Sequence, residues 1–333
     1  MVLNDFHCHF YTYDSGAVMD KIIAWAYAQK EISIGMILNN IRETNLWEKG
    51  AEFSLSKNRD NFTVIPFIGI HPWDSGEADE QIINRLEEIS AKTGAFIGEF
   101  GLDKLKGADK DKQLYIFRSC LDIALKSKKP FTIHCVRSWG LLTEELQKAK
   151  NRIKAPFIIH SYNGSAEIMK TITALGGYPS FALERYGAFS RKAEDSISKI
   201  DLSRLLLETD FTCYLKQQEP EEDDRDSENS ANINNLALPD EVCLFREEDV
   251  VGGFNTKISK LLFNLKRPNG RGIKPTDGIK YSKEDSYYGK KYIKRVLSAY
   301  NKAAAILKMD ITELSGVIEE NGKIFKAYTI NRK

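Results

Sequence analysis

The chain holds five histidines, and each lies at or just beyond the end of a short apolar run. They are His7, His9, His71, His134 and His160. Imidazole is the commonest metal ligand in proteins and also carries protons near neutral pH. A single histidine is most often a hydrogen-bonded structural residue. Five histidines at equivalent places after apolar runs instead predict one shared site for metal-assisted chemistry.

His7 and His9 are separated by one residue within the apolar run 2–9. Because side chains alternate between the two faces of a strand, both imidazoles would point to one face and Cys8 to the other. Two imidazoles on one face can chelate a metal ion. Asp5 would share that face two residues deeper, where its carboxylate could orient a ligand.

Two carboxylates stand at the ends of other apolar runs. Glu99 lies between glycines in the segment Ile-Gly-Glu-Phe-Gly (97–101), and glycine there would let the backbone approach a ligand closely. Asp210 follows the segment Leu-Leu-Leu-Glu-Thr (205–209). An unpaired charge beside so apolar a run would be costly unless it met a cation.

Four imidazoles and two carboxylates are more than the four ligands of a closed structural zinc site. We therefore predict two divalent cations, with Glu99 as the carboxylate that bridges them at about 3.5–4 Å. Imidazole ligands favour Zn, Mn or Fe, whereas carboxylates and a phosphate substrate would also admit Mg.

The elements that must position these residues follow a rhythm of short apolar runs and longer stretches of helical periodicity. Helical patterns cover 18–30, 288–307 and 311–318. The predicted strands are 2–9, 34–39, 62–70, 95–99, 131–135, 156–161, 178–183 and 205–208. Eight strands separated by helices predict an α/β protein with a (β/α)8-type TIM barrel, regular or distorted. In such a barrel the carboxyl ends of all strands converge on one face, where the histidines would meet.

The rhythm breaks after Asp210, which predicts a long insertion after the last strand. We expect 1–215 and 286–333 to form the barrel and 216–285 to form the insertion. It opens with an acidic run at 219–228, typical of a flexible loop, and continues into a segment with a basic excess between 257 and 283. It contains no histidine. The basic segment could contact nucleic acid, dock on a protein partner or have no role, and we expect no catalytic group from it.

Composition and charge exclude several classes of protein. The net charge is only +1, so any nucleic-acid surface must be local. Five cysteines without a C-x-x-C pair argue against a disulfide framework or a cysteine zinc site. The start of the chain lacks the pattern of a signal peptide, and no run approaches the roughly 18 apolar residues of a membrane span. We expect a cytoplasmic protein with no membrane contact.

Taken in order, the motifs resemble those of the TatD family of metal-dependent deoxyribonucleases, which is related to the amidohydrolase superfamily. The likeness covers 1–215 and resumes near residue 287. Its segments are Asp-Phe-His-Cys-His (5–9), Gly-Ile-His-Pro-Trp (69–73), Gly-Glu-Phe-Gly-Leu-Asp (98–103), Ile-His-Cys (133–135), Ile-His-Ser-Tyr-Asn-Gly-Ser (159–165) and Glu-Thr-Asp (208–210).

The resemblance implies a nuclease that acts on DNA ends or single strands. The metal ligands that it implies are His7, His9, Glu99, His134, His160 and Asp210. Glu99 and Asp210 would be the catalytic carboxylates, with Asp210 as the general base for the attacking water. His71 would lie near the substrate phosphate without binding a metal. The expected substrate contacts are His71, Trp73, Arg137, Tyr162 and Asn163.

The sequence departs from the family pattern in three places. The family often has His-x-Arg on the fifth strand, whereas Arg137 comes one residue later here. Residues 160–164 read His-Ser-Tyr-Asn-Gly where a Cys-Phe-Ser order is common. The family also usually passes from Glu-Thr-Asp to its last helix within a few tens of residues, and here the insertion intervenes.

Two other functions fit the same residues. An amidohydrolase, lactonase or ester hydrolase would use the same two cations and an activated water, because fold and metals do not choose the substrate. A scaffold that binds a partner without catalysis is the second alternative, although the six expected ligands are all present. Arg137, Trp73 and the basic segment favour nucleic acid.

Overall fold

The structure is a computed structural model that describes residues 1–10, 19–20, 22, 33–59, 61–184, 187–212 and 283–330, with the backbone alone of 283–291 and 330. The predicted helix at 18–30 falls almost wholly outside the described residues. So does most of the predicted insertion, because 213–282 are not described.

Nine parallel strands form one curled sheet in the order β8-β7-β6-β5-β4-β3-β2-β1-β9. The sheet is TIM-barrel-like, so the predicted α/β barrel is confirmed. The strands are β1 (Val2–His9), β2 (Ser33–Ile41), β3 (Thr63–Ile68), β4 (Phe96–Asp103), β5 (Phe131–Val136), β6 (Phe157–Ile159), β7 (Gly177–Ala182), β8 (Leu206–Glu208) and β9 (Phe211–Thr212).

The last two strands bring the two ends of the sheet together. β8 pairs with β7, and β9, which follows after two residues, pairs with β1. The Asp210 amide between them donates to the His7 carbonyl oxygen at 3.0 Å. The chain from 206 to 212 thus places Asp210 beside His7, although the two are far apart in sequence.

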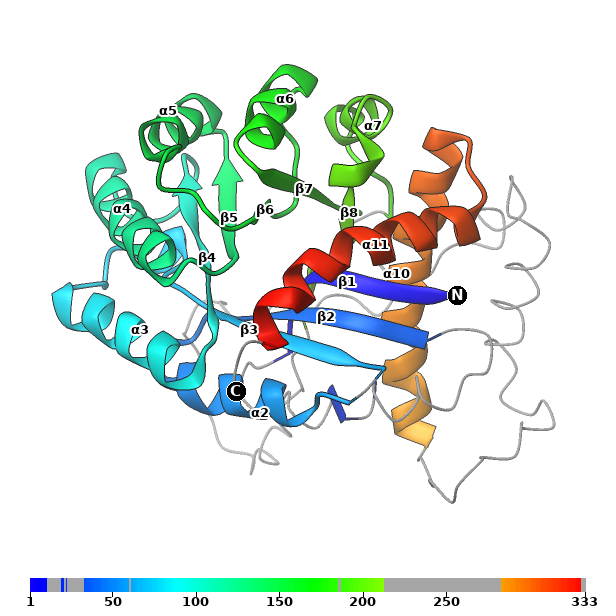
Figure 1. The fold of residues 1–333 in the computed structure, drawn as a ribbon, viewed down its shortest axis with the longest axis horizontal. Coiled ribbons are helices and arrows are strands. Elements are labelled where there is room, and N and C mark those ends of the chain that lie inside the picture. The colour runs from blue at the N-terminus through cyan, green and yellow to red at the C-terminus, as the bar shows by residue number, and fades with distance from the viewer. Residues whose placement is uncertain are drawn as a thin grey trace, which may run out of the picture.

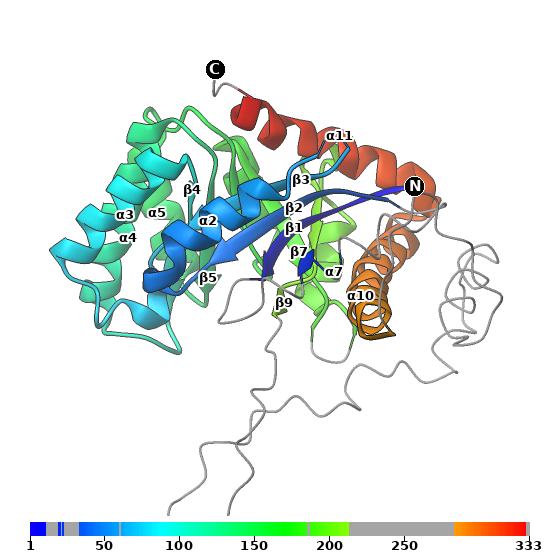
Figure 2. The ribbon, with the colours of Figure 1, turned by 90° about the horizontal axis from the view of Figure 1, so that it is seen from below.

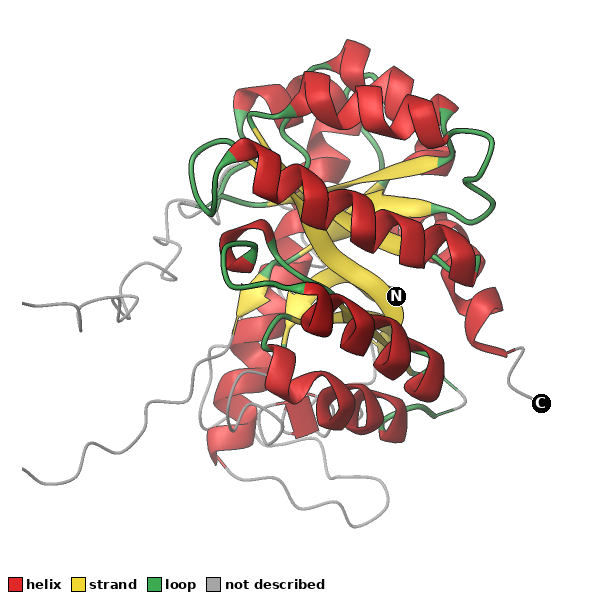
Figure 3. Ribbon diagram, turned by 90° about the vertical axis from the view of Figure 1, so that its left-hand side faces the viewer, coloured by secondary structure: helices red, strands yellow, loops and turns green. Residues whose placement is uncertain are grey.

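The helices cover the outside of the sheet (Figure 1). Seen from the side, the strands occupy the middle of the molecule and helices lie around them (Figure 3). Side-chain caps start several helices; for example, Asp109 accepts from the amides of Asp111 and Lys112. No helix among the described residues combines the length and apolarity needed to cross a bilayer. The α-helices are α2 (Trp47–Ser56), α3 (Glu80–Thr93), α4 (Lys110–Ser127), α5 (Trp139–Ala149), α6 (Ala166–Ala174), α7 (Arg191–Ile197), α10 (Lys283–Leu307) and α11 (Ile311–Ile330), and short 3-10 helices are η2 (Thr44–Leu46), η3 (Pro72–Asp74) and η4 (Leu202–Arg204).

The two C-terminal helices lie beside the start of β1 (Figure 2). The Tyr300 hydroxyl of α10 donates to the Asn4 carbonyl oxygen and accepts from the Asn4 amide, each at 3.0 Å. The Asn321 amide group of α11 donates to the carbonyl oxygens of Leu202 and Leu205, which precede β8. α11 therefore covers the end of the barrel at which the strands begin, and leaves the other end for the site.

A register shift between Asp5 and Cys8 interrupts the alternation that the sequence predicts for β1. The Asp5 carboxylate accepts from the Thr209 hydroxyl and amide, from the Tyr292 hydroxyl of α10 and from the His7 amide. It contacts the backbone of His7 and no described imidazole. Asp5 therefore ties β1 to α10 and to the chain after β8, and among the described contacts it holds His7 through the backbone amide rather than through the imidazole.

β4 continues four residues beyond the predicted end of its strand, so Glu99 lies in mid-strand. Gly101 pairs with His134 of β5, and a Cβ on Gly101 would lie 1.9 Å from the His134 carbonyl oxygen. A Cβ on Gly98 would lie 2.4 Å from the Thr132 side chain. These glycines admit the neighbouring strand, rather than a ligand as the sequence suggested, and so bring Glu99 close to His134.

Replacing Gly101 by alanine should force β4 and β5 apart. We expect Gly101→Ala to lower the free energy of unfolding by about 1–3 kcal/mol, as overpacking of a filled interior does. Gly316→Ala is the matched control, because no described atom lies within 4 Å of the added Cβ in α11. That control should gain about 0.5–1 kcal/mol. Urea unfolding of both variants measures the difference, and equal stabilities would contradict the close approach of β4 to β5.

Candidate metal centre

A cavity of about 520 Å³ lies at the end of the barrel where the strands finish. A ring of aromatic, acidic and basic side chains surrounds its inner histidines and carboxylates. The lining consists of His9, Arg42, Glu43, Thr44, Asn45, His71, Trp73, Asp74, Glu77, Glu99, His134, His160, Asp210 and Thr212.

Glu99 lies at the centre of the cavity floor, and its two carboxylate oxygens face different histidines. Oε1 lies 2.7 Å from His134 Nδ1 and 3.1 Å from His160 Nε2. Oε2 lies 3.2 Å from His7 Nε2 and 3.8 Å from His9 Nε2. The Glu99 side chain is 5% exposed. One carboxylate therefore stands between two pairs of imidazoles, as a bridging ligand would.

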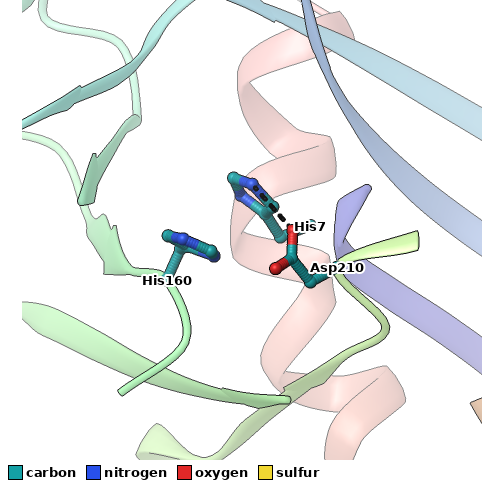
Figure 4. Close-up of side chains that lie close together, drawn as sticks. All are labelled: His7, His160 and Asp210. Atoms are coloured by element: carbon teal, nitrogen blue, oxygen red, sulfur yellow. Dashed lines mark ion pairs between the residues drawn. The ribbon is translucent and has the colours of Figure 1, made fainter. Parts of the chain in front are cut away.

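Asp210 completes the half of the centre that contains His7 and His9. Its Oδ1 lies 3.6 Å from His9 Nε2 and 4.0 Å from His7 Nε2. Figure 4 shows the Asp210 carboxylate directed at His7, and the His160 ring stacks on the His7 ring with their centroids 3.9 Å apart. Asp210 has φ +47°, a left-handed conformation that is uncommon for residues other than glycine and often marks functional positions. Its side chain is 40% exposed, so it reaches the open cavity.

Asn40 of β2 anchors both histidines of β1. His9 Nδ1 donates to the Asn40 carbonyl oxygen at 3.0 Å, which leaves His9 Nε2 with a free lone pair. The Asn40 side-chain amide lies 3.0 Å from His7 Nδ1, and its Oδ1 is buried without a hydrogen-bond partner among the described residues. For His7 Nε2 to bind a cation, Nδ1 must carry the proton, and the Asn40 amide group must be turned so that Oδ1, rather than the nitrogen, faces Nδ1 and accepts from it.

Carboxylates anchor the other two histidines that face Glu99. His160 Nδ1 donates to Glu208 Oε1 at 3.0 Å, and Glu208 also accepts from the Ser161 amide. His134 Nε2 lies 3.4 Å from Asp103 Oδ2. In each case a carboxylate oxygen can accept a hydrogen bond from the outer N–H, so the inner nitrogen of the neutral ring presents its lone pair to the cavity.

His71 has the opposite arrangement. Its Nδ1 accepts from the Trp73 amide at 3.2 Å, so the neutral ring carries its proton on Nε2. That nitrogen lies 3.4 Å from Glu99 Oε1. His71 therefore offers a donor to the cavity where the other four histidines offer acceptors.

The charges of the cavity favour an ionised carboxylate at its centre. Burial alone would raise the pKa of Glu99, but the imidazoles of His160, His71 and His7 hold that pKa well below its ordinary value. Burial opposes protonation of His160, yet Glu99 and Glu208 raise its pKa well above the ordinary value. Without a metal, the charge of Glu99 is thus balanced by protonated imidazole, and a cation would displace that proton.

The donor set fits divalent cations. Three groups of ligand atoms lie within 4.8 Å of one another, namely His7 with His160 and Asp210, His7 with His9 and Glu99, and His71 with Glu99 and His134. Imidazole nitrogen and carboxylate oxygen suit Zn, Mn or Fe. The proton on His71 Nε2 makes His160 the better partner of His134 and Glu99. The residues that would hold cations are His7, His9, Glu99 and Asp210 in one half and Glu99, His134 and His160 in the other.

The remaining residues predicted to bind substrate fall into two groups. His71 and Trp73 line the cavity. Arg137 and Asn163 are exposed and lie outside the lining formed by the described residues. Tyr162 is also outside it, because the side chain is buried and its hydroxyl donates to the Ser165 carbonyl oxygen at 2.6 Å.

Sequence reasoning missed the residues that orient the histidines. Glu208 and Asp103 lie in the motifs 208–210 and 98–103, which also contain predicted ligands. A second carboxylate in such a motif could have indicated this role. Asn40 gave no signal, because it ends an ordinary apolar run. Arg42 and Glu43, which line the cavity, were missed for the same reason.

Removing the anchor of His160 should weaken metal binding. Glu208→Gln keeps the size of the side chain but replaces the carboxylate that accepts from His160 Nδ1, so affinity for Mn²⁺ should fall about 10–100-fold. Glu194→Gln, an exposed change on α7, is the control and should bind as the parent does. Calorimetric titration measures both. Parental affinity in Glu208→Gln would mean that His160 is not a ligand held in this way.

Comparisons with known proteins identify relatives of this chain. The family described as TatD related DNase matches residues 4–236. An uncharacterized metal-dependent hydrolase of Buchnera aphidicola subsp. Acyrthosiphon pisum (strain APS) is 30% identical over 156 residues, which are 44% of this chain and 59% of that relative. Deoxyribonuclease Tat-D of Schizosaccharomyces pombe (strain 972 / ATCC 24843) is 27% identical over 208 residues, 57% of this chain and 62% of that relative.

A solved structure shares the fold. The TatD homologue YJJV of Escherichia coli K12 superposes with a TM-score of 0.60 at 16% identity, over 97% of both chains. The family match spans well over half of the sequence and includes every residue of the centre described above. This chain therefore belongs to the TatD-related DNase family and is a metal-dependent hydrolase of that family.

Proposed function

We propose that the chain hydrolyses phosphodiester bonds of DNA with two divalent cations bound on either side of Glu99. The observation that carries the proposal is the division of the Glu99 oxygens between two pairs of histidines. The relative from Schizosaccharomyces pombe, which is named a deoxyribonuclease, supports DNA as the substrate. Cations bound here would stabilise charge on the phosphoryl oxygens and lower the pKa of a water molecule.

Asp210 is the general base in this proposal. Removal from water alone would raise its pKa, but the nearby imidazoles of His9, His160 and His7 lower it below the ordinary value. The carboxylate is therefore ionised, and its exposed side chain can reach a water molecule in the cavity. A base must lie within hydrogen-bond reach of the proton that it removes. Asp210 meets this requirement for a water held near His7 and His9.

His71 is the donor to the substrate phosphate in this proposal. Burial lowers its pKa, so the ring is neutral, and the Trp73 amide keeps its proton on Nε2. A neutral N–H directed into the cavity can donate to a phosphoryl oxygen without carrying a charge. Glu99 Oε1 is the present neighbour of that N–H, and a substrate oxygen would compete for it.

A neutral ester or amide is the second candidate substrate, and the charge of the mouth favours it. Glu43, Asp74 and Glu77 line the cavity, whereas Arg42 is the lone basic lining residue among those described. Arg42 also forms a bidentate ion pair with Asp74, with both contacts at 2.6 Å. The acidic side of the mouth would repel a polyanion, so the substrate strand must leave the cavity on the other side. The insertion 216–285 stays a candidate for nucleic-acid or protein contact and lies mostly outside the described residues.

A panel of substrates decides between the two candidates. The purified full-length chain, supplied in turn with Mn²⁺, Zn²⁺ and Mg²⁺, should cut single-stranded DNA and bis(p-nitrophenyl) phosphate. It should act slowly or not at all on p-nitrophenyl acetate. Hydrolysis of the acetate alone would replace the phosphodiesterase proposal by that of an ester hydrolase.

The role of Asp210 is tested by Asp210→Asn. The amide cannot take the proton of the water, so turnover of both phosphodiesters should fall on the order of 10²–10⁴-fold. Asp195→Asn, which changes an exposed carboxylate on α7, is the control and should retain parental turnover. Metal content is measured on the same samples, because loss of a ligand could lower activity through metal loss. Near-parental turnover in Asp210→Asn would exclude it as the base.

A further inference from the structure

One edge of the cavity is a surface of hydrogen-bonded residues that takes no part in the proposed metal centre. It consists of Trp73 of η3 and residues 104–108 between β4 and α4, and we call it the ledge. We propose that the ledge binds the single-stranded nucleic acid next to the cleaved phosphate, with one base stacked on Trp73 and its phosphate held by Lys106. This inference rests on the proposed function, because it places the strand relative to the scissile bond.

Trp73 is held with its ring exposed. The side chain is 40% exposed, although large apolar groups at a cavity edge gain from burial. Its indole N–H donates to Asp103 Oδ2 at 2.6 Å, and its amide donates to His71. These two bonds fix the ring while leaving it open to the cavity that it lines. A fixed, exposed aromatic ring can stack on any of the four bases, because every base has a π-face.

Side-chain hydrogen bonds hold the loop beside Trp73 in place. The Gln113 side-chain amide nitrogen of α4 lies within 3.0 Å of the carbonyl oxygens of Asp103, Lys106 and Ala108. Asp103 Oδ1 accepts from the amides of Leu105 and Lys106. Such a surface loses little conformational entropy when a ligand binds.

Gly107 allows this loop to pack directly against η3. It has φ +94°, and an added Cβ would lie 2.2 Å from the Pro72 carbonyl oxygen. Only glycine tolerates both the left-handed conformation and the close approach. The loop and Trp73 are therefore parts of one surface, so a ligand that spans them meets fixed groups.

The side chains of the ledge match the chemistry of a single strand. Lys106 Nζ lies over the Trp73 ring, 4.2 Å from its centroid, and has no carboxylate partner among the described residues. Leu105 is 59% exposed beside it. The Arg42 guanidinium lies 5.1 Å from the same ring centroid. A base that stacks on Trp73 would displace the Lys106 ammonium from the ring and leave it beside the phosphate. Cations next to an aromatic ring are the combination that binds single-stranded nucleic acid without sequence preference.

The ledge also continues from the metal centre. The ring centroids of Trp73 and His134 are 6.3 Å apart, and Asp103 contacts both side chains. A base stacked on Trp73 would therefore lie next to a phosphate bound over Glu99. The acidic side chains Glu43 and Glu77 would repel the strand elsewhere along the rim. A base inside a duplex is already stacked and cannot occupy Trp73, so the ledge favours single strands or frayed ends.

Equilibrium binding to the full-length chain tests the ledge apart from catalysis. Fluorescence anisotropy with a short labelled single-stranded oligonucleotide is measured in a chelator, so that no strand is cut. Trp73→Ala should weaken binding roughly 10- to 100-fold, and Trp73→Phe should restore most of the loss. Lys106→Gln should weaken binding and reduce the slope of log affinity against log salt by roughly 0.7. Lys110→Gln, an exposed lysine at the start of α4, is the control and should leave both quantities unchanged.

A blunt duplex is the second arm of the experiment. Trp73→Ala should weaken duplex binding much less than single-strand binding, because stacked and paired bases cannot use the ring. Three results would each overturn the proposal. They are equal losses of affinity for the single strand and the duplex in Trp73→Ala, no loss of affinity in that variant, and an unchanged salt slope in Lys106→Gln. Failure of the proposed function would look different, since the metal-loaded parent would then cut no phosphodiester while the variants still changed binding.

Discussion

The ionised Glu99 carboxylate is the constraint on which the rest of the site depends. A buried carboxylate is stable only if it is paired and hydrogen-bonded, and Glu99 is buried among imidazoles that lower its pKa. Each of its oxygens meets a different pair of histidines. The charge must be balanced by protonated imidazole or by metal, and the two-sided arrangement is the reason for proposing two cations. The outer nitrogens of those histidines then need oxygen partners, which Asn40, Asp103 and Glu208 supply.

The barrel meets this constraint by bringing distant strands together at close range. Gly101 admits the His134 backbone, so β4 and β5 approach each other beside Glu99. The left-handed turn at Asp210 directs its carboxylate to His7 while β9 joins β1. Asp5 links β1, the chain after β8 and α10, and so supports the same junction from behind. The close packing of β4 on β5 and the left-handed conformation of Asp210 thus both position the side chains of the site.

The barrel and the convergence of histidines and carboxylates at one end of it could be predicted because they depend on local patterns. The spacing of His7 and His9, the glycines around Glu99 and the alternation of apolar runs with helices are all visible in sequence. The register shift in β1 could not be predicted, because it depends on the pairing with β2. Nor could the tautomer of His71 be predicted, because it is set by the turn at η3. Which side chains reach the mouth, Arg42 rather than Arg137, is likewise a product of tertiary packing.

A diffraction experiment on crystals soaked in Mn²⁺, recorded for anomalous scattering, tests the central claim most directly. Two anomalous peaks should appear about 3.5–4 Å apart, one beside each carboxylate oxygen of Glu99. His7, His9 and Asp210 should surround one peak, and His134 and His160 the other, with His71 outside both coordination shells. A single peak, or two peaks that Glu99 does not contact, would contradict the account of Glu99 as the carboxylate that bridges two cations.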